Sequence, residues 1–185
     1  MVRFKNRWLL VEFIPIPTTA SGGAPTSRTT LGQLPNNSAQ LPPLDGKQIW
    51  TALKQSILTN FGDVGWGSVA PSLTVKYFSP TTNTAIIRVA REHHKIAWAG
   101  LTLLSTIGGV RSTAGGRGGT GDGVRYIPNV VHLSGTIKHC QLAAIEHNRV
   151  VVARYRALAN NPAGYQDSYD AFLEKTMLEI QALQD

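Results

Sequence analysis

The 185-residue sequence predicts one α+β domain, and three features of the chain support that expectation. The length fits a single domain of ordinary size. An apolar share of 42% is enough to build a core and excludes general disorder. Short apolar runs of strand type alternate along the chain with amphipathic helical stretches. No run of about 18 uncharged apolar residues occurs, so we expect neither a transmembrane helix nor a membrane partner.

The first half of the chain predicts a strand, a helix and a hairpin. The apolar run Trp8–Ile14 has the length of a buried strand. Asp45 is suited to cap a helix that carries an apolar side chain at every fourth residue and ends at Gly62. Apolar and polar residues alternate over 73–77, and a β-branched run follows over 85–90. The turn sequence between these two runs makes them a hairpin.

The second half predicts a helix, a strand and two more helices. A helix is expected over 92–107, ending at Gly108, and a strand over 126–133. A long helix of about 137–160 and a last helix of about 167–183 complete the chain. The first six elements have the order of a split βαβ unit, which is ferredoxin-like or RRM-like: a four-stranded antiparallel sheet with two helices on one face. We expect the two extra C-terminal helices to cover the other face, at least in part.

Two stretches differ from this pattern in composition, and we read both as loops inserted into a single domain that spans residues 1–185. Residues 15–44 hold six of the ten prolines and only one charged side chain. Residues 108–124 hold eight of the 18 glycines. Neither composition provides an apolar face that could pack into a core.

The charge is unevenly distributed. Residues 1–160 carry 17 basic and six acidic side chains, whereas residues 161–185 carry one basic and five acidic. A basic body of this kind attracts polyanions, and the usual polyanion is nucleic acid. The alternative is that the charge only keeps a small protein soluble. The single cysteine excludes a disulfide scaffold and indicates a reducing compartment, cytosol or nucleus.

No motif for catalysis or metal binding is evident. Residues 116–121 match G-x-G-x-x-G, but the expected helix lies before them and the strand after, the reverse of a dinucleotide fingerprint. His93 and His94 are adjacent, so their side chains diverge by about 100° on a helix. No base is paired with Cys140 at a useful spacing. We therefore expect no catalytic residue and no cofactor bound by the protein itself.

Candidate RNA contacts follow from charge rather than from aromatic stacking, because residues 84–89 lack the aromatic side chains on which RNA-recognition domains stack bases. Residues 134–136 break a strand and can cap the long helix, whose first N–H groups would then face a phosphate. The arginines of the glycine-rich stretch either contact RNA in extended form or are merely solvated. The candidates are Arg3, Lys5, Arg7, Lys76, Arg88, Arg111, Arg117, Arg125, Gly135, Thr136 and Lys138.

Three segments carry a resemblance to a known family. They are Met-Val-Arg-Phe-Lys-Asn-Arg-Trp-Leu at 1–9, the hairpin segments 75–77 and 86–88, and Leu-Ser-Gly-Thr-Ile-Lys-His-Cys-Gln at 133–141. Together they resemble the family of the fifth "processing of precursor RNA" protein subunit of ribonuclease P, which is shared with ribonuclease MRP. The resemblance covers residues 1–14 and roughly 45–158, in the order of the family.

The resemblance implies an accessory subunit of an RNA-based endoribonuclease. In that complex a catalytic RNA removes the 5′ leader of precursor tRNA using bound Mg²⁺, and ribonuclease MRP processes precursor rRNA. The family implies that the protein braces the catalytic RNA with precursor tRNA close by, and that it pairs with a barrel-fold protein subunit and other basic subunits. It also implies a location in the nucleus and nucleolus.

Other function classes stay open at this point. One is an independent phosphatase or nuclease built on the same split βαβ frame, which would need a convergent acid, base or anion loop. Another is a protein–protein adaptor whose basic surface is incidental. A third is an RNA-binding protein of another ribonucleoprotein.

Overall fold

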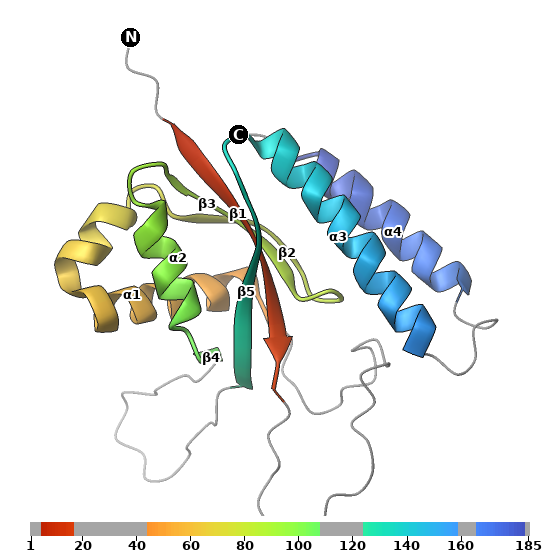
Figure 1. Ribbon diagram of the computed structural model, residues 1–185, viewed down its shortest axis with the longest axis horizontal. Coiled ribbons are helices and arrows are strands. Elements are labelled where there is room, and N and C mark those ends of the chain that lie inside the picture. The colour runs from red at the N-terminus through yellow and green to blue at the C-terminus, as the bar shows by residue number, and fades with distance from the viewer. Residues whose placement is uncertain (1–4, 17–43, 108–123, 159–165, 184–185) are drawn as a thin grey trace, which may run out of the picture.

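The computed structural model describes residues 5–16, 44–107, 124–158 and 166–183, and it shows an antiparallel sheet with helices on both faces (Figure 1). The two predicted inserts fall almost wholly outside these ranges. The elements in chain order are β1 (Asn6–Pro15), α1 (Gly46–Val69), β2 (Thr74–Ser79), β3 (Thr84–Ala90), α2 (His94–Thr102), β4 (Thr106–Ile107), β5 (Val124–Ser134), α3 (Ile137–Leu158) and α4 (Gln166–Gln181).

The sheet has the order β2-β3-β1-β5-β4, and every neighbouring pair is antiparallel. Strand β1 lies in the middle, between β3 and β5, and β2 is one edge. The four strands β1, β2, β3 and β5 have the order of a split βαβ unit, which confirms the predicted α+β fold. The prediction of only four strands is wrong by one, because β4 adds a short fifth strand beside β5.

Strand β4 arises where the sequence predicts the end of a helix over 92–107. Helix α2 ends at Thr102, and Thr106 and Ile107 pair instead with the first residues of β5. The Tyr126 N–H donates to the Ser105 carbonyl at 3.1 Å, which continues the ladder by one residue. Ile107 is buried in the core. A β-branched pair that gains both a strand partner and burial favours the extended backbone over another helical turn.

Helix α1 is longer than predicted because Gly62 kinks the chain without ending the helical run. Gly62 has φ 65° and ψ −168°, a conformation that glycine adopts at little steric cost. The helix then resumes and runs to Val69. The kink brings Trp66 back to Trp50, with ring centroids 5.7 Å apart and nearly perpendicular. The Lys54 ammonium lies over both rings, 5.4 Å from the Trp66 centroid.

Helices α1 and α2 cover one face of the sheet. The core on this side joins Leu9, Val11 and Phe13 of β1 to apolar side chains of both helices. The apolar residues that recur every fourth position in α1 are Ile49, Leu53 and Ile57, and all three are fully buried. Fully burying each such side chain contributes about 1.5–3 kcal/mol.

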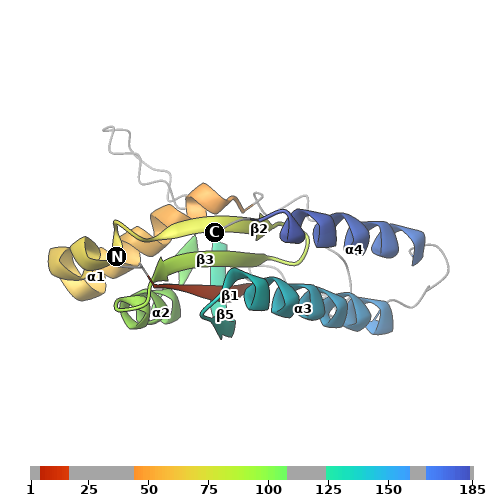
Figure 2. The same cartoon turned by 90° about the horizontal axis from the view of Figure 1, so that it is seen from above.

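Helices α3 and α4 cover the opposite face, as predicted. Figure 2 shows the sheet from above, with α1 and α2 on one side and α3 and α4 on the other. A second core joins Trp8 and Leu10 of β1 to Cys140 of α3 and Ile180 of α4. The Gln141 amide donates to the carbonyl oxygens of Ile180 at 2.7 Å and Leu183 at 3.0 Å, which fastens the end of α4 to the start of α3. None of the helices in the described ranges has the length and apolar character needed to cross a bilayer.

A bulge in edge strand β2 breaks the alternation that the sequence shows over residues 73–77. Val75 pairs with Ile87 while Tyr77 pairs with Ile86, so Lys76 is the extra residue. Val75 therefore packs into the α1–α2 core, and Tyr77 packs into the α3–α4 core. The bulge divides the apolar side chains of one short strand between the two faces.

Helices α1 and α2 can pack closely at Gly100 because glycine has no side chain. A Cβ at this position would lie 2.6 Å from Ile57 Cγ1, and the Ser56 hydroxyl donates to the Gly100 carbonyl at 2.7 Å. We expect Gly100→Ala to lower the free energy of unfolding by about 1–3 kcal/mol, because the helices must move apart. Urea unfolding followed by circular dichroism measures the effect.

Gly67→Ala is the matched control. A Cβ at Gly67, in the same helix as Ile57, meets nothing within 4 Å. Alanine there should be neutral or stabilise by up to about 1 kcal/mol, through its higher helix propensity. Equal effects of the two substitutions would contradict the close approach at Gly100.

Candidate nucleic-acid interface

One end of the sheet gathers basic side chains from several elements. Here β1 begins, β3 ends and β5 leads into α3 (Figure 1). Trp8 of β1 pairs with Arg88 of β3 on one side and with Ser134 of β5 on the other. The Arg91 N–H donates to the Lys5 carbonyl at 2.8 Å. We call this surface the basic end, defined by Lys5, Arg7, Arg88, Arg91, Lys95 and Lys138.

Helix α3 begins at the basic end because of a short polar sequence after β5. The Ser134 hydroxyl donates to the Thr136 carbonyl at 2.8 Å and accepts from the Thr136 N–H at 3.2 Å. This local loop ends the strand and turns the chain into the helix. Gly135, Thr136 and Lys138 are all exposed. The first N–H groups of the helix are therefore presented beside a cation, an arrangement that favours a bound anion.

The Arg7 guanidinium lies directly against this helix start. A Cβ at residue 135 would lie 3.0 Å from Arg7 Nη1, so the guanidinium packs closely against the Gly135 backbone. Arg7 Nη1 donates a long hydrogen bond of 3.4 Å to the Asn6 carbonyl. Arg7 lies 128 positions before Gly135 in the sequence, and the structure brings these two predicted contacts together.

Arg88 approaches the same place from β3. Its side chain is half-buried, and its Nε is buried without a hydrogen-bond partner among the described residues. In register it lies next to Trp8, on the face that α3 covers. Arg88 therefore contributes a guanidinium to the basic end from within the sheet.

The other predicted contacts lie in different places. Lys76 is the bulged residue of edge strand β2, two positions after Thr74, which pairs with Arg88. Arg125 is exposed at the opposite end of β5, about 30 Å from Ser134 at the rise of a strand. Arg3, Arg111 and Arg117 lie outside the described residues. Their predicted contacts with RNA stay predictions.

Two cations of the basic end were absent from the predicted set. Arg91 follows β3 directly, and Lys95 lies in the first turn of α2. His94 Nδ1 is 2.6 Å from the Arg91 carbonyl, which ties the start of α2 to the end of β3. The predicted topology was the available signal, because in a split βαβ unit the third strand runs antiparallel beside the first and therefore ends next to its start.

Helices cover much of both faces of the sheet, although Ile14 of β1 and its partner Ile127 of β5 are about half exposed. Trp8 is 1% exposed and Phe13 is fully buried, so the aromatic side chains of the central strand belong to the two cores. RNA-recognition domains stack bases on an open sheet face. Here α3 and α4 pack over Trp8 and Leu10, so that part of the second face offers no aromatic platform.

Cys140 and His147 are removed from solvent to a large extent. Burial raises the pKa of the Cys140 thiol to about 12, so the thiol stays protonated at neutral pH. Across the described ranges, no group of three His, Cys, Asp or Glu side chains is placed to hold a metal ion. His147 Nε2 of α3 lies 3.6 Å from Glu12 Oε2 of β1, in a mostly buried pair.

Comparison with known proteins identifies the family. A family model described as the Rpp14/Pop5 family matches residues 7–145. The chain belongs to the Rpp14/Pop5 family. The match runs from Arg7, through the whole sheet, into α3, so it includes both segments that meet at the basic end.

Curated relatives agree with this membership. The chain is 39% identical to "Ribonuclease P/MRP protein subunit POP5" of Schizosaccharomyces pombe, over 80% of this chain and 89% of the relative. It is 33% identical to the protein of the same name in Saccharomyces cerevisiae, over 82% of this chain and 80% of the relative. The human protein of that name is 24% identical, over 80% of this chain and 73% of the relative.

The buried His147 makes stability depend on pH. Burial lowers its pKa, the Glu12 carboxylate offsets part of that effect, and Arg154 adds to it. Because the folded pKa is lower than the unfolded value of 6.5, the unfolded chain binds the proton more readily. This stability is fully present above pH 6.5 and is lost as pH falls through the folded pKa. Urea unfolding between pH 7.5 and 5.5 should show a falling midpoint.

His147→Gln provides the comparison, because glutamine is polar, of similar size, and does not titrate. The variant should lose part of the decline below pH 6.5, while the exposed histidines contribute equally to both proteins. Parallel pH profiles for wild type and variant would show that His147 does not cause the decline.

Proposed function

We propose that this chain is a protein subunit of the ribonuclease P/MRP ribonucleoprotein and that it braces the RNA through the basic end. The observation that carries the proposal is the convergence of Arg7 on Gly135 at the start of α3, within the region that matches the Rpp14/Pop5 family. The relatives carry the name of this complex. The physical arrangement supplies what RNA binding requires, cations and helix N–H groups on one accessible surface.

The contact is with phosphates rather than with stacked bases. Covered sheet faces leave no aromatic platform, whereas Lys5 and Lys138 are exposed and Arg7 is half-exposed. Each cation that neutralises a phosphate releases condensed counterions and lets RNA segments approach one another. The protein thereby stabilises a folded RNA without reading its sequence.

The cleavage chemistry belongs to the RNA. In this proposal Mg²⁺ sits at the RNA active site, where it serves 5′-leader removal from precursor tRNA and, in the MRP form, processing of precursor rRNA. The chain contributes no catalytic residue. Support comes from the protonated, buried thiol of Cys140 and from the burial of His147, the histidine nearest a carboxylate in the described part of the chain.

The proposed partners and location follow the family. The chain would contact the catalytic RNA, with precursor tRNA close by, and would assemble with a barrel-fold subunit and other basic subunits. It would reside in the nucleus and nucleolus. We propose no membrane partner for the chain.

Affinity purification of the tagged full-length chain from its host tests the subunit assignment. We expect one long structured RNA and several basic proteins to come with it, together with 5′-leader cleavage of precursor tRNA. Micrococcal nuclease treatment should abolish the cleavage while leaving the chain intact. Cleavage that survives loss of the RNA would overturn the assignment of catalysis to RNA.

Salt dependence tests the basic end. Replacing Lys5, Arg7 and Lys138 together with alanine should reduce the slope of log affinity against log salt by about two to three, near one unit per lost phosphate contact. Filter binding of the purified chain to the RNA, across a range of salt concentrations, gives the slope.

Lys47→Ala with Lys175→Ala is the control, since both lysines are exposed and neither belongs to the basic end. The control should leave the slope within about half a unit of wild type. Equal slopes for all three proteins would remove the basic end from RNA binding. Weak, salt-insensitive binding by wild type would favour the adaptor alternative.

A further inference from the structure

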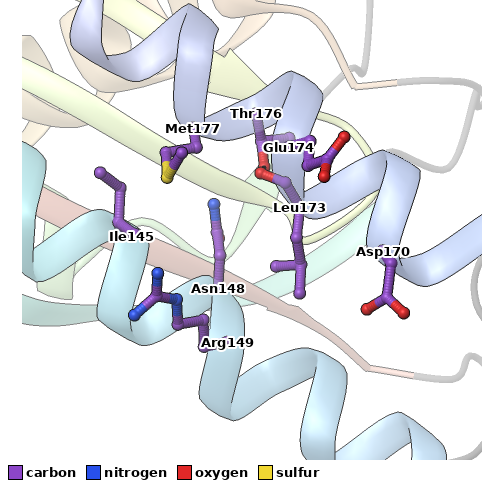
Figure 3. Close-up of a pocket in the computed structure, with 8 residues that line it drawn as sticks. All are labelled: Ile145, Asn148, Arg149, Asp170, Leu173, Glu174, Thr176 and Met177. Carbon is purple, nitrogen blue, oxygen red and sulfur yellow. The ribbon is translucent and has the colours of Figure 1, made fainter.

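A pocket of about 280 Å³ lies between α3 and α4, away from the basic end. Figure 3 looks into it, with side chains from both helices turned toward the space between them. The lining residues are Ile145, Asn148, Arg149, Asp170, Leu173, Glu174, Thr176 and Met177. Along α3 the pocket begins about 10 Å from Lys138, at the rise of a helix. None of its lining residues belongs to the basic end.

Asn148 is the unusual member of this lining. It is 2% exposed, and both Oδ1 and Nδ2 are buried without a hydrogen-bond partner among the described residues. Its side chain reaches from α3 toward α4 (Figure 3). The nearby Thr176 hydroxyl is bonded to carbonyl groups of its own helix, Phe172 at 2.9 Å and Leu173 at 3.1 Å. An unpaired buried polar group costs about 1–3 kcal/mol, so this amide is suited to a ligand that satisfies it.

The chemistry of the lining fits an extended peptide. A carboxamide offers one acceptor oxygen and two N–H donors, the complement of a main-chain N–H and carbonyl. Ile145, Leu173 and Met177 supply apolar walls for a side chain next to that peptide group. Leu142 and Leu178 are both about two-thirds exposed. Leu142 lies about one helical turn before Ile145, and Leu178 directly follows Met177, so both add exposed apolar side chains near the pocket.

The charged residues at the pocket opening favour a protein ligand over a nucleic acid. Asp170 and Glu174 stand on the α4 side of the opening, and both are exposed. The Arg149 guanidinium lies on the α3 side (Figure 3). A phosphate chain entering the pocket would pass two carboxylates, which repel it. A lysine or arginine side chain would be attracted by the same two groups.

We propose that the α3–α4 pocket binds an extended segment of a basic protein, with a main-chain amide on Asn148 and a lysine or arginine beside Glu174. The proposal rests on the proposed function only in naming the source of that segment, a basic subunit of the same ribonucleoprotein. The basic end would then face RNA while the acidic side of α4 faces protein.

Site-specific photo-cross-linking in the purified complex is the first test. Ala171 is exposed on α4 beside Asp170, and it is replaced by p-benzoylphenylalanine in the full-length chain. Thr102 of α2, also exposed, carries the same group in the control protein. We expect the probe at 171 to cross-link one protein subunit within a few residues of a lysine or arginine. Cross-links to RNA, to a second copy of this chain, or to nothing would overturn the proposal.

Binding of a synthetic peptide with the cross-linked sequence is the second test. Asn148→Leu should weaken the peptide about tenfold, the loss of about 1.4 kcal/mol, while leaving the thermal midpoint unchanged or raised, because the variant removes an unpaired buried amide. Glu174→Lys should also weaken peptide binding about tenfold. Glu146→Lys is the control, because Glu146 is exposed on α3 outside the pocket, and it should leave the peptide affinity unchanged. Wild-type affinity for both pocket variants would refute the pocket as the binding site.

The two proposals fail in different ways. If the complex contains the RNA but the probe at 171 reaches no basic protein, the pocket proposal alone is lost. If no RNA accompanies the chain, the ribonuclease P/MRP assignment is lost, and the cross-link and the peptide measurements still decide the pocket.

Discussion

Burial of strand β1 on both faces is the constraint on which this structure depends. Leu9, Val11 and Phe13 point into one core, and Trp8 and Leu10 into the other, each at most 1% exposed. A strand whose side chains are apolar on both faces of the sheet needs a layer of packed structure on each face. The split βαβ unit supplies α1 and α2 for the first layer, so a second pair of helices has to supply the other.

The same constraint determines how the molecule can meet RNA. Once α3 and α4 cover the second face, the aromatic side chain of Trp8 serves packing and not base recognition. Helix α3 starts where β5 ends, and antiparallel pairing puts that point next to the beginning of β1. Arg7 and Gly135 therefore meet as a consequence of strand register. The position of the basic end is a product of the sheet topology.

Helix α4 gives the protein a second surface of opposite character. It is held to the start of α3 by the Gln141 amide and by Ile180 in the core. Along its exposed side Asp170, Glu174 and Glu179 outnumber Lys175, in contrast to the basic body. A subunit inside a ribonucleoprotein needs one surface for RNA and others for protein, and electrostatics separates the two kinds of contact.

The sequence by itself determined the split βαβ order, the need for a second helical layer and the basic candidates near residues 5–7 and 135–138. Apolar periodicity and capping residues are local signals, so they can be recognised from the sequence alone. It misplaced the end of α1 and missed β4, because a left-handed glycine can kink a helix as well as end it, and because Thr106 and Ile107 become a strand only beside β5. Strand register and helix packing decided which cations share a surface. They also buried the Asn148 amide without a hydrogen-bond partner in the described part of the chain. Those depend on contacts between residues far apart in the chain, and no local pattern encodes them.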